Sequence, residues 1–305
     1  MIPLSKLQDG DQRVNNGKRK GAVRVRTWIA LERIAAAPPG GGEDVVLQGI
    51  DFRVGAGEFV AVVGVNGSGK STLLRVLAGL LPVAEGKAAT HPEADGAVRI
   101  VFQNPDAQLI GETVYEEIAF GLEQLGVPTE EMPERVRLAL RSVGLDVPAS
   151  TPVERLSGGQ KQLLGIAGAL AAEARVLLLD EPTSMLDPVS KASVVDTVRA
   201  LRDRGLAVVW STQAMDEVGL ADRIVALQDG RVAFEGTPET FFYGEAGKGD
   251  DAHGANDGGV PCVALGLRLP YAVETAHRLR DHGVRLTVRP VTDDQLLEAV
   301  AGLCR

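Results

Sequence analysis

One stretch decides the fold of this chain: Gly64-Val65-Asn66-Gly67-Ser68-Gly69-Lys70-Ser71. It matches the phosphate-binding-loop pattern G-x-x-x-x-G-K-[ST] at every fixed position. The residues before it, 59–63, form a continuous apolar run, which predicts a buried parallel strand. Residues 71–80 after it have helical periodicity. The loop therefore has the preceding strand and the following helix that a phosphate-binding loop requires.

The residue types of this loop explain its chemistry. Glycines let the backbone wrap closely round a phosphate, so that several N–H groups point at one anion. The helix that starts at Lys70 adds the positive end of its dipole. We expect Lys70 to reach the β- and γ-phosphates of ATP, Ser71 to bind Mg²⁺ and Thr72 to reach a phosphate oxygen. The predicted nucleotide-binding residues are Asn66, Gly67, Ser68, Gly69, Lys70, Ser71 and Thr72.

A second motif supplies the carboxylates that such a loop needs. It is an apolar strand that ends in two acids, Val176-Leu177-Leu178-Leu179-Asp180-Glu181. We expect Asp180 to hold Mg²⁺, directly or through water, and Glu181 to take a proton from an attacking water. Acids at the end of a strand are usually only solvated, but in a chain with a phosphate-binding loop they predict ATP hydrolysis.

Charge and hydropathy narrow the possible classes of protein. The net charge of −9 argues against nucleic acid as the main partner, since phosphate neutralisation needs clustered lysine and arginine. No run of about 18 uncharged apolar residues is present, so no segment is expected to span a bilayer. The N-terminal residues are polar and mixed in charge, unlike a secretory signal. We expect a cytoplasmic protein that reaches a membrane only through a partner.

Strand-like and helical segments alternate over residues 25–243, which predicts an α/β domain with a mainly parallel sheet. Within it, residues 104–158 form a predicted helical subdomain, with breaks at 126–128 and at Pro133. We see no internal repeat, so one such domain is expected.

Three further segments flank this domain. Residues 1–24 are predicted to be a flexible, solvated tail. Residues 244–262 are rich in Gly and Asp and are predicted to be a linker. Residues 263–305 show a helix–strand–helix pattern, which predicts a small C-terminal α/β domain. Both cysteines, Cys262 at the end of the linker and Cys304, lie near the C-terminus, and they fit neither a metal site nor a disulfide framework.

A third motif shows a resemblance to a known family. Residues Leu156-Ser157-Gly158-Gly159-Gln160-Lys161-Gln162 resemble the signature sequence of ABC ATPases. The resemblance implies a head-to-tail dimer with a second cassette, in which Ser157, Gly158 and Gly159 of one subunit bind the ATP held by the loop of the other. Ser184-Met185-Leu186-Asp187 resembles the D-loop, which places Asp187 at the same interface. Gln103 resembles the Q-loop glutamine, which senses Mg²⁺ and couples to a membrane partner.

A narrower resemblance is to the ATPases of energy-coupling-factor transporters. It rests on Asn104-Pro105-Asp106-Ala107-Gln108-Leu109, on residues 116–122 and on the C-terminal region, which resembles that family's dimerisation domain. The resemblance implies a peripheral subunit on the cytoplasmic face of the membrane, which drives uptake of a vitamin or transition-metal ion. It implies a transmembrane coupling subunit contacted near Gln103–Gln108, and a substrate-capture subunit contacted only indirectly. A generic importer cassette with an unrelated tail is the alternative.

Two positions depart from the family pattern. Thr212-Gln213 stands where the family has Thr-His, and glutamine can donate a hydrogen bond but cannot carry a proton or a positive charge. Residues 34–37 lack the aromatic side chain on which related cassettes stack adenine. Trp28 is a candidate replacement if the strand register differs.

Three functions remain open at this point. The first is an importer motor, in which Glu181, Gln213 and Gln103 are the catalytic residues and Ser71, Gln103 and Asp180 hold the metal. The second is an ABC ATPase that acts on DNA or ribosomes, which the single cassette and acidic balance disfavour. The third is a regulatory subunit that binds nucleotide and hydrolyses it weakly, which Gln213 favours. The sequence names no solute, and Gln213 favours a heterodimer over a homodimer.

Overall fold

The computed structural model describes residues 2–3, 26–37, 46–244, 259–284 and 286–304. The predicted tail lies outside the described residues except for Ile2–Pro3, which form strand β1 beside β5. Most of the predicted linker, residues 245–258, also lies outside them. Among the described residues, no helix is both long and apolar enough to cross a membrane.

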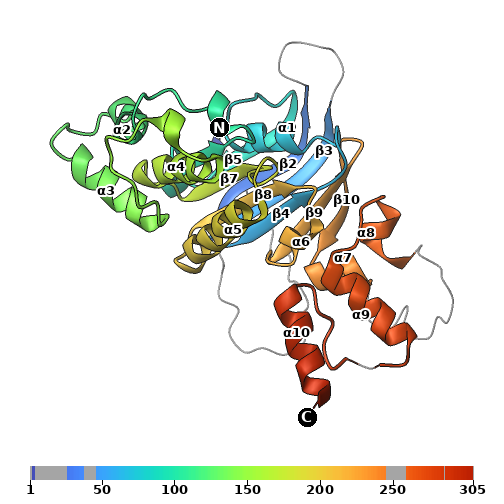
Figure 1. The fold of residues 1–305 in the computed structure, drawn as a ribbon. Coiled ribbons are helices and arrows are strands. Elements are labelled where there is room, and N and C mark those ends of the chain that lie inside the picture. Colours follow the sequence, from blue (N-terminus) through green and yellow to red (C-terminus); the bar gives the residue numbers. More distant parts are fainter. Residues whose placement is uncertain (1, 4–25, 38–45, 245–258, 285, 305) are drawn as a thin grey trace.

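A six-stranded sheet forms the centre of the molecule, in the order β10-β9-β4-β8-β7-β6 (Figure 1). Its strands are β4 (Phe59–Val63), β6 (Val98–Val101), β7 (Val176–Asp180), β8 (Ala207–Thr212), β9 (Arg223–Gln228) and β10 (Arg231–Gly236). All neighbours in this sheet pair in parallel except β10, which is antiparallel to β9. The mainly parallel α/β fold predicted from the sequence is therefore confirmed.

A second sheet, in the order β1-β5-β2-β3, lies against this centre. Its longer strands are β2 (Thr27–Ala36), β3 (Leu47–Gly55) and β5 (Glu85–Thr90). Helix α1 (Lys70–Leu77) packs between the two sheets, because its apolar side chains share one core cluster with β2, β3 and alternate residues of β4. The other face of β4 belongs to a second core, which α5 (Pro188–Asp203) covers. Every residue of β4 and β7 is buried, which explains their continuous apolar sequence.

The helical subdomain lies at one end of the molecule (Figure 1). It contains α2 (Val114–Gln124), α3 (Met132–Ser142) and α4 (Gly158–Ala171), with the short turns η3 (Pro105–Ala107) and η4 (Val153–Arg155). The predicted break at residues 126–128 separates α2 from α3. The predicted break at Pro133 is wrong, because Pro133 lies in the first turn of α3, where a missing N–H breaks no helical hydrogen bond.

The C-terminal region lies at the other end and is helical as far as it is described (Figure 1). After α6 (Met215–Val218) and α7 (Pro238–Tyr243), it contains α8 (Pro261–Ala264), α9 (Tyr271–Asp281), α10 (Asp293–Ala301) and η6 (Gly302–Cys304). The strand expected between α9 and α10 is absent from the described residues there. The described part of this region is therefore helical, and the predicted α/β character of the C-terminal domain is not seen in it.

The C-terminal helices are also less separate from the main domain than the linker prediction implied. Cys262 falls inside the predicted linker, yet it is fully buried in α8 and belongs to the same core as β4 and α5. Val273 and Val291 join that core as well. A small cluster of Ala272, Ala276 and Leu296 holds α9 to α10. The region thus packs on the main domain while keeping a minor core of its own.

Candidate functional site

The phosphate-binding loop joins β4 to α1 and depends on glycine at two crowded points. A side chain at Gly64 would collide with the carbonyl oxygen of Leu227 on β9. Gly69 has φ 105°, and a Cβ there would lie 2.7 Å from Cδ2 of Leu47. Only glycine adopts this backbone and leaves room for these neighbours. The loop is therefore held in its wrapped shape by strands on both sides.

Lys70 lies folded back over this loop, and its side chain is 5% exposed. Its Nζ donates to the carbonyl oxygens of Gly64 at 2.9 Å and Val65 at 3.3 Å. The same ammonium lies 3.3 Å from Oε1 of Glu181. A buried ammonium group is stable only with hydrogen-bond acceptors or an anion beside it. Its position over the loop fits a lysine that binds phosphate.

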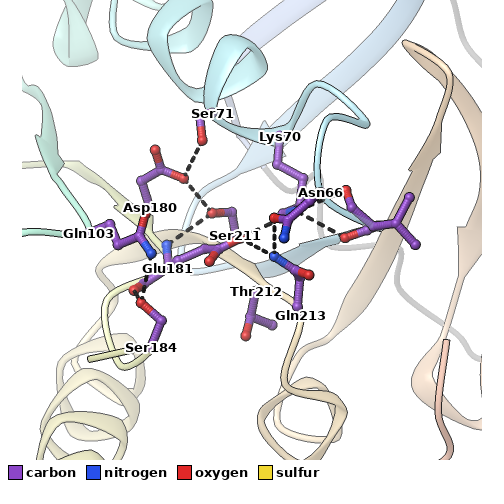
Figure 2. A network of polar contacts seen from close by, with 12 residues as sticks. Asn66, Lys70, Ser71, Gln103, Asp180, Glu181, Ser184, Ser211, Thr212 and Gln213 are labelled. Carbon is purple, nitrogen blue, oxygen red and sulfur yellow. Dashed lines mark hydrogen bonds and ion pairs between the residues drawn. The ribbon is translucent and has the colours of Figure 1, made fainter. Parts of the chain in front are cut away.

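Asp180 ends β7 next to the start of α1 (Figure 2). Its Oδ1 accepts hydrogen bonds from the hydroxyl of Ser71 at 3.0 Å and the hydroxyl of Ser211 at 2.8 Å. The structure thus brings together Ser71 and Asp180, two of the three predicted metal ligands. Hydroxyl and carboxylate oxygens are the donors that Mg²⁺ prefers, so this pair fits the ion.

Gln103, the third predicted metal ligand, follows β6 and lies beside Asp180 and Glu181 (Figure 2). Its Nε2 donates to the hydroxyl of Ser184 at 3.1 Å, and that hydroxyl donates to the carbonyl oxygen of Glu181 at 3.0 Å. Gln103 is therefore connected to Glu181, the predicted base, through Ser184 rather than bonded to Asp180.

Glu181 and Gln213 meet beside the loop. Gln213 Nε2 donates to Oε1 of Glu181 at 2.9 Å and to Oδ1 of Asn66 at 2.6 Å. The backbone N–H of Glu181 donates to the carbonyl and hydroxyl oxygens of Ser211, both at 3.1 Å. Glu181 has φ 46°, an uncommon conformation for a residue other than glycine. The amide of Gln213 thus orients the carboxylate that the sequence assigned as the base.

The signature residues lie at the start of α4, where Ser157 forms a reciprocal cap with Gln160. Asp187 caps α5 in a similar way and accepts from the Ser190 hydroxyl at 2.6 Å, and this bond, with the N–H of Ser190, lowers the pKa of Asp187. A Cβ at Gly159 would lie 2.7 Å from Cβ of Ser190, so the glycine lets the two helix starts approach closely. Ser157 and Asp187 therefore lie on one surface, and this surface is separate from the contacts that surround Lys70.

Comparison with known proteins agrees with the resemblance to ABC ATPases seen in the sequence. Residues 47–184 match the family model described as ABC transporter. The chain is 43% identical to the energy-coupling factor transporter ATP-binding protein EcfA1 of Symbiobacterium thermophilum, over 85% of this chain and 89% of that protein. The corresponding protein of Geobacillus kaustophilus is 40% identical, over 84% of this chain and 90% of its own length. The chain belongs to the energy-coupling factor transporter ATP-binding proteins, a family of ABC transporters.

A solved structure extends this similarity to the fold. The structure of cbiO1 from Clostridium perfringens, described as part of the ABC transporter complex cbiONQ, superposes with a TM-score of 0.64 at 31% identity. The superposition covers 71% of this chain and 91% of that one.

The hypothesis that Trp28 stacks on adenine is wrong. Trp28 is 6% exposed, and its ring packs edge-on against His91 with centroids 5.4 Å apart. It lies at the far end of β2 from Ala36, which pairs with Leu47 beside the loop. At about 3.3 Å per residue, the distance along the strand is about 26 Å. Trp28 therefore cannot stack on a nucleotide held at Lys70.

Two polar residues of the site, Ser211 and Glu217, were not predicted from the sequence. Ser211 bonds both Asp180 and Glu181, and Glu217 anchors the segments that hold Glu181 and Gln213. The signal for Ser211 was a hydroxyl residue at the end of an otherwise apolar strand. Glu217 had no such signal, since a glutamate on a short helix is usually solvated.

Proposed function

We propose that this chain is the ATP-hydrolysing motor subunit of an energy-coupling factor importer. The single observation that supports this best is the contact of Lys70, Glu181 and Gln213 beside the Ser71–Asp180 pair. This arrangement offers a cation for phosphate, a carboxylate for an attacking water and oxygen donors for Mg²⁺, all at the carboxyl ends of parallel strands. ATP hydrolysis coupled to transport is the activity of the ABC family to which the chain belongs.

Each residue has a distinct task in this proposal. The loop N–H groups and Lys70 bind the phosphates of ATP, and Ser71 and Asp180 would hold Mg²⁺, which would supply charge neutralisation there. Glu181 accepts the proton of the attacking water, and Gln213 keeps its carboxylate turned toward the loop. Gln103 links this group to the helical subdomain through Ser184.

A second cassette, either a related subunit or another copy, completes the site in this proposal. The surface that carries Ser157, Gly158, Gly159 and Asp187 would bind the ATP of the opposite subunit through the N-terminus of α4. Next to it, Met185 is 64% exposed and Val189 is 79% exposed. Exposed apolar side chains of this size favour a protein interface at this surface.

A groove in the helical subdomain is the proposed contact site of a transmembrane partner. The groove has a volume of about 470 Å³ and is lined by residues that include Gln108, Ile110, Phe120, Leu125 and Leu164. Ile110, Phe120 and Leu125 are at least 45% exposed. Gln108 lies at its edge and accepts a hydrogen bond from the N–H of Phe102, one residue before Gln103. We propose that a helix of the coupling subunit occupies this groove on the cytoplasmic face of the membrane, with the substrate-capture subunit contacted only through it.

A charged residue introduced into this groove is expected to prevent binding of the transmembrane subunit without affecting ATP hydrolysis. Phe120→Glu should abolish co-purification with the transmembrane subunit from membranes, because a carboxylate cannot be buried against an apolar helix. The ATPase activity of the purified chain should stay within about twofold, since Phe120 lies on α2 of the helical subdomain and forms none of the hydrogen bonds described for the site. Leu138→Glu on α3 is the matched control, being 50% exposed but outside the groove, and should co-purify normally. Normal co-purification of Phe120→Glu would contradict the groove assignment.

The second candidate function is a nucleotide-binding regulatory subunit with weak hydrolysis, and Gln213 is the observation that favours it. Its amide donates to Glu181 but cannot carry the positive charge of a histidine. We propose slow but measurable hydrolysis by the unaltered chain. Gln213→His should raise kcat about tenfold, because a charge-assisted hydrogen bond to phosphate is stronger than a neutral one. Steady-state ATPase assays measure this; an unchanged or lower kcat would show that residue 213 does not limit turnover.

A further inference from the structure

Glu217 on α6 is a buried carboxylate close to the site, and the mechanism above does not use it. Its side chain is 3% exposed. A carboxylate is buried at a large cost in free energy unless hydrogen-bond donors surround it. Its surroundings should therefore show what it holds in place.

Both carboxylate oxygens of Glu217 are fully engaged, each by a different pair of donors. Oε2 accepts from Trp210 Nε1 at 3.0 Å and from the Thr212 hydroxyl at 2.6 Å. Oε1 accepts from the Thr183 hydroxyl and lies 3.1 Å from Nζ of Lys191. One side chain thus joins the end of β8, the loop after β7 and helix α5.

The Oε2 side controls the backbone around Gln213. Thr212 precedes Gln213, and its hydroxyl donates to Glu217 while accepting the N–H of Ala214 at 3.0 Å. The N–H of Glu217 also donates to the carbonyl oxygen of Ala214 at 3.1 Å. The residues on both sides of Gln213, Thr212 and Ala214, are therefore both bonded to Glu217. Figure 2 shows Thr212 beside Gln213.

The Oε1 side controls the segment that carries Glu181. Thr183 lies two residues beyond Glu181 in the turn, where the N–H of Ser184 donates to the carbonyl oxygen of Glu181. Lys191 lies one turn into α5, and its N–H donates to the carbonyl oxygen of Asp187. The same carboxylate thus ties the segment of the predicted base to the helix that starts at the dimer surface.

We propose that Glu217 is a positioning residue for ATP hydrolysis, which holds Glu181 and Gln213 at the mutual distance that their 2.9 Å hydrogen bond requires. It touches neither the nucleotide-binding loop nor the groups that react. This inference rests on the proposed function, because it needs Glu181 to act on ATP.

Glu217→Gln is the diagnostic change, because no orientation of a glutamine satisfies these partners. The Trp210 N–H and the Lys191 ammonium can only donate, and they lie on opposite oxygens. Burial alone would lower the pKa of Lys191, but Asp216 and Glu217 raise it, so Lys191 stays charged. The NH₂ group of glutamine must therefore face one of these donors, and one anchor of the site is lost.

The experiment measures ATP binding and turnover separately on the full chain. For Glu217→Gln we expect kcat at saturating Mg-ATP to fall about tenfold to a hundredfold, as misplacement of a catalytic group does. The Kd for a fluorescent ATP analogue should stay within about twofold, because the loop and Lys70 are untouched. Asp216→Asn is the matched control: it lies on the same helix and also contacts Lys191, but it is exposed and should keep kcat.

Other results have distinct meanings. A kcat for Glu217→Gln within about twofold of that of the unaltered chain overturns the positioning role. A parallel loss of ATP binding overturns it too, because it points to general damage. If the unaltered chain neither binds nor hydrolyses ATP, the proposed function itself fails. Should Glu217→Gln not fold, Thr212→Val, which removes only the hydroxyl relay, must lower kcat at unchanged Kd, and Thr212→Ser must recover it.

Discussion

Glu181→Gln is expected to abolish ATP hydrolysis by this chain while leaving ATP bound. Glutamine has the size of glutamate, and its carbonyl oxygen can still accept the bond that Gln213 Nε2 makes to Oε1 at 2.9 Å. It cannot accept a proton from water, and general-base catalysis contributes about 10² to 10⁴-fold to a rate. Since the unaltered chain is expected to be slow, kcat should fall below detection.

The same substitution should preserve or strengthen nucleotide binding. Glu181 Oε1 lies 3.3 Å from Lys70 Nζ, so its negative charge competes with phosphate for that cation. A neutral amide removes the competition, and an ATP-bound dimer should accumulate on size-exclusion chromatography with Mg-ATP. Glu85→Gln, an exposed glutamate on β5, is the control and should hydrolyse normally. Turnover that survives Glu181→Gln would show that another group is the base.

Lys70→Met is expected to lower ATP affinity about a hundredfold or more. A charge-assisted hydrogen bond from a buried ammonium to phosphate contributes about 3 kcal/mol, and each 1.4 kcal/mol is about tenfold in Kd. Methionine has nearly the same length, so the loop should keep its packing while losing the cation. It also leaves Glu181 without its ion-pair partner, which places an uncompensated negative charge where the γ-phosphate must bind.

Equilibrium binding of a fluorescent ATP analogue measures this effect directly. Lys87→Met, which removes an exposed lysine on β5, is the control and should leave Kd unchanged. Thermal unfolding of both variants shows whether the chain stays folded. An unaltered Kd for Lys70→Met would place the nucleotide away from the loop and overturn the proposed site.

Local motifs made the core of the site predictable. The loop 64–71 and the strand that ends in Asp180 each encode their own chemistry in consecutive residues, and a parallel sheet brings the ends of its strands to one edge. Ser71 therefore lies bonded to Asp180, and Glu181, which follows Asp180, lies bonded to Gln213. Predictions that depended on partners elsewhere in the chain were less secure. The strand expected between α9 and α10 does not form among the described residues there, and Trp28 lies at the wrong end of its strand.

The sequence by itself determined the residues of the proposed nucleotide site, because glycines, a lysine and two acids at fixed spacing act through short-range backbone geometry. Only the tertiary structure decided how Gln213 meets Glu181, how Ser184 links Gln103 to that base, and that Glu217 binds Thr183, Lys191, Trp210 and Thr212 together. These contacts join residues that are distant in the chain. A buried carboxylate is fixed by the donors that folding places around it, and no local pattern encodes them.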